Sequence, residues 1–206
     1  MSQNKMNPDK KPVAMVIGAT SKWQSDGRNT LLAHGRALDD GGLPVGARWG
    51  VGGAISQKFA HEGFFTVLTT RKHANAEPLA AAIRDQGGQC MIAELDLASE
   101  QSIADAFEAV RRAAGAPEVV VYNAGYLEGR DLPPEQELLE YIPVEMFDTA
   151  HHIANRGIFL TAKQALPTMR KSGHGSFLIS NLAEGTRRII AEGVREKLRA
   201  KYFADE

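Results

Sequence analysis

The sequence has little that would mark it as secreted, membrane-bound or nucleic-acid-binding. Cys90 is the single cysteine in 206 residues, which excludes an internal disulfide and favours a reducing, cytoplasmic location. The formal net charge is −1, so the composition gives no reason to expect nucleic acid or an acidic membrane as a partner. No apolar run reaches the length of a membrane span. Residues 1–11 are polar and lack the apolar core of a signal peptide, and we interpret them as a disordered tail before one domain spanning residues 12–206.

What the sequence does contain is an alternation of two apolar patterns. Short runs rich in β-branched and aromatic residues are typical of buried strands, and longer stretches with apolar residues three or four apart are typical of amphipathic helices. This alternation predicts an α/β fold with a doubly wound parallel sheet and right-handed crossovers. The expected strands are 12–18, 64–70, 90–97, 118–122 and 176–180, and the expected helices begin at Gly50 and cover 77–86, 99–114 and 144–169.

A glycine-rich loop is divided between two places in the chain. Gly18, Ala19 and Thr20 follow the first strand, and Gly50, Val51 and Gly52 open the next helix. Between them, residues 22–49 form a polar insertion without periodicity. Without the insertion the order is strand, glycine loop and helix, which lets a backbone approach the pyrophosphate of a dinucleotide. The alternative interpretation is two unrelated turns, and the insertion is either a cover over the site or a mobile loop.

Several further motifs follow in a fixed order, and together they resemble the short-chain dehydrogenase/reductase family over about residues 12–181, apart from the insertion. The resemblance implies a three-layer α/β/α domain with sheet order 3-2-1-4-5, truncated relative to the family. It also implies NAD(P) as cofactor and hydride transfer to or from a small-molecule carbonyl or alcohol. The motifs beyond the glycine loop are Asp96-Leu97, Tyr122-Asn123-Ala124-Gly125, residues 155–159 and residues 175–180.

The resemblance also assigns cofactor-binding residues. Asp96 and Leu97 match the adenine side of the family's site, and Asn123, Ala124 and Gly125 match the segment that lines the cofactor beside the fourth strand. Asp96 has a second interpretation, an acid in the approach to the next helix.

The end of the second predicted strand bears on the choice of cofactor. Arg71 and Lys72 stand where an acid would hold the ribose hydroxyls of NAD, and no acid occurs before Glu77. Two cations can instead pair with a ribose phosphate, so NADP is favoured over NAD. The alternative is two solvated cations at a strand end.

The family's catalytic set is an asparagine, a serine, and a tyrosine followed four residues later by lysine. By resemblance Asn155 and Ser180 fill the first two roles, although Asn155 lies one residue closer to Gly157 than is usual. That offset turns a helical side chain by about 100° unless the backbone adjusts. After residue 181 the only tyrosine is Tyr202, and residue 206 after it is glutamate. The tail instead has the pattern of a basic amphipathic helix.

Three functions therefore stay open: a reductase, a non-catalytic NAD(P)-binding module for regulation or assembly, and another nucleotide-using enzyme such as a methyltransferase. The Asn-Ala-Gly turn argues against the last, and the missing tyrosine favours the second. His151 and His152 are adjacent on the fourth helix and point in different directions, so they make a poor metal pair and no metal site is expected. We instead expect a surface or interface role for these histidines, and an oligomer of this chain would form through the fourth helix.

Overall fold

The computed structural model describes residues 11–19, 31–33, 36–38, 49–125 and 139–180. Its main sheet has five parallel strands in the order β5-β4-β1-β6-β7, which is the predicted order 3-2-1-4-5. The strands are β1 (Val13–Ile17), β4 (Phe65–Thr70), β5 (Gln89–Glu94), β6 (Val119–Tyr122) and β7 (Ser176–Ile179). The prediction of a doubly wound α/β fold is therefore confirmed.

The centre of the sheet is β1, and its sequence explains that place. All five of its residues are buried, as expected of a parallel strand covered on both faces. Met15 lies in register with Val67 of β4 on one side and Val120 of β6 on the other. A strand without a polar side chain has no face that water could occupy, so it takes the central position.

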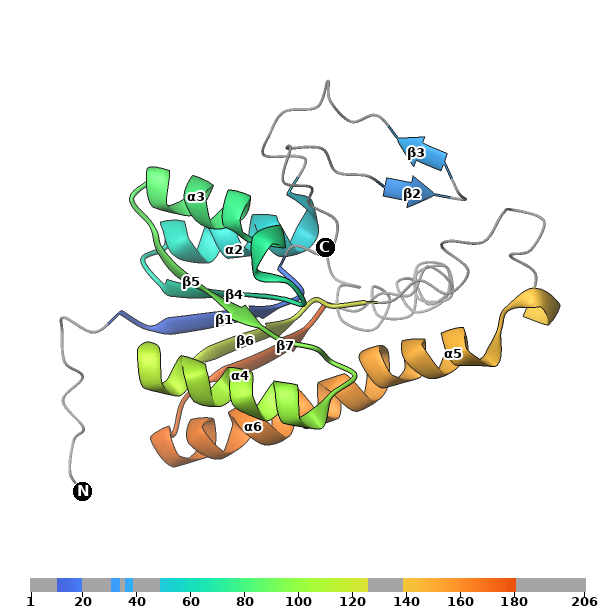
Figure 1. Ribbon diagram of the computed structural model, residues 1–206. Helices are drawn as coiled ribbons and strands as arrows, with labels where there is room; N and C mark the ends of the chain where they lie inside the picture. The colour runs from blue at the N-terminus through green and yellow to red at the C-terminus, as the bar shows by residue number, and fades with distance from the viewer. Residues whose placement is uncertain (1–10, 20–30, 34–35, 39–48, 126–138, 181–206) are drawn as a thin grey trace, which may run out of the picture.

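Helices cover both faces of this sheet (Figure 1). On one side α2 (Gly50–His61) and α3 (Glu77–Asp85) enclose a core that contains Leu68 and Leu79. On the other, α4 (Glu100–Ala113) and α6 (Gly157–Ser172) enclose a core that contains Phe107 and Tyr122. The expected cap at Ser99 is present, because its hydroxyl accepts a hydrogen bond from the Ser102 N–H at 3.2 Å.

The long fourth helix is interrupted. It begins as α5 (Val144–His151), passes through a π-helical turn η4 (His152–Arg156) and continues as α6. The predicted helix over 144–169 is therefore present, but its hydrogen-bond register changes immediately before Gly157. Figure 1 shows that α5 continues the line of α6 beyond the sheet.

Some boundaries differ from the prediction. The third strand stops at Glu94 because the chain then turns toward α4, and the fifth stops at Ile179, which leaves Ser180 just beyond the strand. The insertion holds a short antiparallel pair, β2 (Leu31–Ala33) and β3 (Arg36–Leu38), which its irregular pattern did not predict. Two short turns, η1 (His73–Asn75) and η3 (Leu139–Tyr141), complete the elements.

Other predictions fall outside the described residues. They are the tail up to residue 10, Thr20, most of the insertion, and the amphipathic pattern after residue 181. Within the part of the chain that the structure describes, no helix is both long and apolar enough to cross a membrane.

Candidate functional site

The two halves of the interrupted glycine loop contact each other. Gly18 follows β1 with φ of +80°, a conformation that favours glycine, and Gly52 lies in the first turn of α2. A Cβ added at Gly52 would stand 2.8 Å from Nδ2 of Asn123 and 2.9 Å from the carbonyl oxygen of Ala19, and closer still to that of Gly18. The 33 residues between Gly18 and Gly52 therefore do not separate the turns, and the alternative of two unrelated turns does not hold.

Thr69, which the sequence analysis did not single out, anchors the first of these turns. Its hydroxyl accepts a hydrogen bond from the Gly18 N–H at 3.0 Å and donates one to the Val16 carbonyl at 2.9 Å. The Thr69 carbonyl also accepts from the Ala19 N–H at 3.1 Å. Because Thr69 is buried, the direction of the Gly18 turn is fixed from the neighbouring strand.

Asn123 links the glycine turn to the fifth strand. Its Nδ2 donates to the Gly18 carbonyl at 3.1 Å, and its Oδ1 accepts from the Ser180 hydroxyl at 2.7 Å. The backbone N–H of Ser180 donates to the Tyr122 carbonyl at 2.9 Å. Gly18, Asn123 and Ser180 therefore form one hydrogen-bonded row across the carboxyl ends of β1, β6 and β7, the edge at which sheets of this kind bind ligands.

The start of α2 lies beside this row and is open toward the residues that the structure describes. Gly50 has φ of +68°, none of the described residues lies within 4 Å of where its Cβ would stand, and Val51 is 65% exposed. The side chain of Trp49 does not cap the helix, and no acidic residue lies in its first turn. Backbone N–H groups at such a helix start attract an anion.

The residues assigned to the adenine side already make contacts within the protein. Oδ1 of Asp96 accepts from the Ala98 N–H at 3.0 Å, which supports the interpretation as an acid in the approach to α4. Leu97 is buried in the core. Ala124 is so close to Gly18 that a Cβ on the glycine would lie 2.7 Å from its Cα, and Gly125 is exposed. A cofactor contact of Asp96 or Leu97 stays a prediction.

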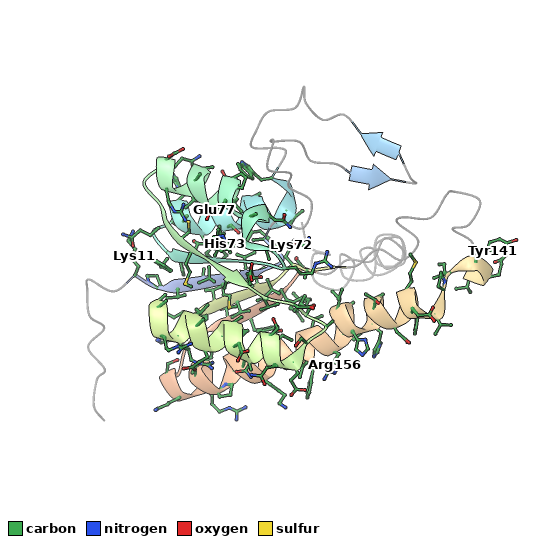
Figure 2. All side chains as sticks on the ribbon, in the orientation of Figure 1. Lys11, Lys72, His73, Glu77, Tyr141 and Arg156 are labelled. Atoms are coloured by element: carbon green, nitrogen blue, oxygen red, sulfur yellow. The ribbon has the colours of Figure 1, made fainter. Side chains whose placement is uncertain are left out.

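The end of β4 carries both the predicted cations and an acid. Arg71 and Lys72 are exposed, as the NADP interpretation requires. Glu94, at the end of β5, pairs in register with Thr70, and its Oε1 accepts from the His73 N–H at 2.8 Å. Figure 2 shows Lys72 beside His73 on the α3 side of the sheet, opposite Arg156 on the α6 side. The sheet therefore brings a carboxylate to the corner where the sequence showed only cations.

Asn155 lies in the π turn, and so the backbone does adjust at the position where its spacing departs from the family's. Its side chain is exposed, with Nδ2 at 3.4 Å from Nδ1 of His151. Among the contacts of the described residues, none joins Asn155 to Ser180. The structure thus brings together the glycine turn, Asn123 and Ser180, and leaves Asn155 on a neighbouring element.

Comparison with known proteins agrees with this geometry. The family model described as "Enoyl-(Acyl carrier protein) reductase" matches residues 46–194, which is most of the chain and extends past residue 181, where the sequence analysis ended the resemblance. "Uncharacterized oxidoreductase YxbG" of Bacillus subtilis (strain 168) is 28% identical over 151 residues, covering 73% of this chain and 53% of that protein. The "2,5-dichloro-2,5-cyclohexadiene-1,4-diol dehydrogenase LinX" of Sphingobium indicum is 29% identical over 141 residues, covering 68% and 54%.

Solved structures share the fold. L-Sorbose reductase from Gluconobacter frateurii, complexed with NADPH and L-sorbose, superposes with a TM-score of 0.61 at 20% identity, covering 82% of this chain and 52% of that one. A 7α-hydroxysteroid dehydrogenase complexed with NADH gives the same values. The chain spans about half the length of the curated relatives it matches. On the family match, the sheet order and the closed glycine turn, the chain belongs to the short-chain dehydrogenase/reductase family.

Proposed function

We propose that this chain binds NADP at the carboxyl edge of its sheet, as a unit of an oxidoreductase that acts on a small carbonyl or alcohol. The observation that carries the proposal is the contact of Gly18, Gly52 and Asn123, because it rebuilds one glycine turn from two distant segments. A side chain at Gly52 would have no room, and Val51 beside it, in the first turn of α2, is exposed. Such a turn lets a pyrophosphate approach backbone N–H groups closely.

The residues present fit this cofactor. Gly50 and Val51 would face the pyrophosphate, and Arg71 with Lys72 would meet the ribose phosphate. Bound NADP(H) would give or accept a hydride. Ser180 would stand toward the substrate, with its hydroxyl oriented by Oδ1 of Asn123. Asn155 keeps the place in the catalytic set that the resemblance implies. The single Cys90 supports a reducing, cytoplasmic setting.

A second candidate function is a non-catalytic NADP-binding module. One observation favours it: none of the four tyrosines in the 206 residues is followed four positions later by lysine. The family's tyrosine transfers the proton that accompanies hydride transfer, and the lysine lowers its pKa. The two candidates share the binding site and differ in turnover alone.

We also propose that α5 and α6 form an interface between copies of this chain. Phe147, Phe159 and Leu166 are 61%, 62% and 42% exposed along these helices, and exposed large apolar side chains are typical of an interface. The helix extends beyond the sheet, so a second copy could pack against it (Figure 1).

Val51→Asp tests the cofactor site without threatening the fold. An acid in the first turn of a helix stabilises it, so the variant should fold at least as well as the parent. Facing a phosphate about 4 Å away, the new charge should cost about 1–4 kcal/mol of binding free energy. NADPH at 100 times its dissociation constant should stabilise the parent by about 2.7 kcal/mol. In a chain of this size each kcal/mol of stability raises Tm by about 2–4 °C.

Val51→Asn is the matched control, because it has the same size and no charge. We expect it to keep most of the rise in Tm that NADPH produces, and Val51→Asp to lose most of it. Equal rises for the two variants would show that the start of α2 is not the phosphate site.

A further inference from the structure

The π turn in the long helix coincides with a hydrogen bond from the sheet. In an uninterrupted α-helix the Gly157 N–H would donate to the Ile153 carbonyl. Here it donates to the His152 carbonyl, one residue earlier, and the Ile153 carbonyl accepts a hydrogen bond from the Tyr122 hydroxyl. The Ile153 carbonyl, which is not bonded to the Gly157 N–H, thus accepts a hydrogen bond from a side chain of β6 instead.

Tyr122 is held in place for this role. It is the last residue of β6, in register with Ile17 of β1 and Ile179 of β7, and its side chain is fully buried. Burial raises the pKa of the Tyr122 phenol well above its usual value, so the hydroxyl keeps its proton and stays a donor across the physiological range. Most buried hydroxyls in proteins have a hydrogen-bond partner, and for Tyr122 the Ile153 carbonyl provides it.

Gly157 makes room for that hydroxyl. Its φ of −61° is ordinary for a helix, so its backbone conformation does not require glycine. A Cβ added there, however, would overlap the Tyr122 hydroxyl oxygen and stand 3.2 Å from the His152 carbonyl oxygen. Glycine is therefore needed at residue 157 because tyrosine stands at residue 122, 35 positions earlier in the chain.

From this arrangement we infer that Tyr122 is a positioning residue, whose hydroxyl holds the π turn open and thereby sets the direction of Asn155. A one-residue change in register rotates a helical side chain by about 100°. Asn155 lies inside the turn, between Ile153 and Gly157, so its direction depends on which carbonyl Gly157 binds. Its role near the substrate rests on the proposed function, but the hydrogen-bond exchange does not.

Tyr122→Phe tests the inference in the full chain. It removes the donor and keeps the ring in the core, so the Gly157 N–H should return to the Ile153 carbonyl. In NMR spectra of the isotopically labelled protein we expect the amide of Gly157 and the side-chain amide of Asn155 to shift by more than a linewidth. Unchanged positions for both signals would overturn the inference.

Val120→Ala is the matched control, because Val120 is a fully buried residue of the same strand and the same core cluster. It should lower Tm and leave the Asn155 signals in place. A control that moved those signals as far as Tyr122→Phe does would show a general loss of packing and would overturn the inference.

A second pair of variants tests the contact from the helix side. Gly157→Ala should lower Tm strongly with Tyr122 present and much less in the Tyr122→Phe background, where its methyl group finds space. An equal fall in both backgrounds would contradict the inference. These measurements need neither cofactor nor turnover. A chain that does not bind NADPH would contradict the proposed function and leave the inference intact. Unchanged NMR signals would contradict the inference and leave the proposed function intact.

Discussion

Arg71 and Lys72 follow the end of β4, and Glu94 ends β5 in register with Thr70, so our proposal for the cofactor depends on the charges at this corner of the sheet. The cations favour a ribose phosphate, whereas a carboxylate repels it and suits the free hydroxyls of NAD. Oε1 of Glu94 is already bound to the His73 N–H, which holds the carboxylate beside the strand end. The balance at this corner is a matter of individual charges, so single substitutions should move it.

Arg71→Asp should weaken binding of NADPH more than that of NADH, because it replaces attraction with repulsion at the ribose phosphate. A charge-assisted contact of this kind contributes about 1–3 kcal/mol. Glu94→Gln should have the opposite effect and improve NADPH relative to NADH. Isothermal titration with both cofactors measures the two changes, and an equal loss for both cofactors in Arg71→Asp would assign the preference to other residues, Lys72 first.

At the scale of single elements, the long helix is the least ordinary part of the molecule. On the inner side α6 packs on the sheet through Leu160 and Ala165, and on the outer side it presents exposed Phe159. The ammonium of Lys163 lies 5.7 Å from the centre of that ring, which is a cation–π contact within one chain. Figure 2 shows Tyr141, the last residue of η3, ahead of the start of this helix and beyond the edge of the sheet.

Phe159→Glu should separate the copies that we propose to associate through this helix. The new carboxylate stands four residues before Lys163, a spacing at which Glu and Lys stabilise a helix, so the monomer should stay folded. Light scattering coupled to gel filtration should show a larger mass for the parent than for the variant. Gln86→Glu, which adds the same charge on the exposed end of α3, should keep the parent's mass. A parent that is monomeric at high concentration would contradict the interface.

At the scale of the whole molecule, the 206 residues match the family over most of their length, and none of their four tyrosines is followed four positions later by lysine. The family match covers residues 46–194, yet relatives such as the Bacillus protein are about twice as long as the part that aligns. In the described structure the hydroxyls nearest the glycine turn belong to threonine and serine, and the side chain of Tyr122 points into the core. A tyrosine hydroxyl is therefore not part of the row formed by Gly18, Asn123 and Ser180.

We accordingly expect this chain to bind NADPH and to reduce ordinary carbonyl compounds very slowly. Loss of acid catalysis lowers rates by about 10²–10⁴-fold. The measurement is NADPH oxidation with a panel of aldehydes, ketones and quinones, beside a Tyr141→Phe variant. Rapid turnover by the parent would contradict the expectation. If that turnover were lost in Tyr141→Phe, Tyr141 would be the proton donor that replaces the family's tyrosine. Tyr126 and Tyr202, which lie outside the described residues, are the next to replace.

The sequence by itself determined the succession of strands and helices along the chain, the cap at Ser99 and the places of the glycine-containing turns. These features depend on neighbours in the chain: β1 is apolar at every residue, α4 is apolar at helical spacing, and a turn needs glycine where φ is positive. Family resemblance then supplied Asn123 and Ser180, and the structure shows that they are hydrogen-bonded to each other.

Only the tertiary structure decided which side chains meet across the sheet. Thr69 reaches Gly18 over a separation of 51 residues, and Tyr122 reaches Ile153 over 31, so no local pattern contains either pair. Glu94 lies beside Thr70, at the strand end that Arg71 and Lys72 follow, because β4 and β5 pair in one register, and a different register would bring another side chain to that corner. The exchange of hydrogen bonds at Gly157 likewise follows from a tyrosine on another element. Local patterns fix the elements, whereas the site depends on contacts that form only after those elements pack.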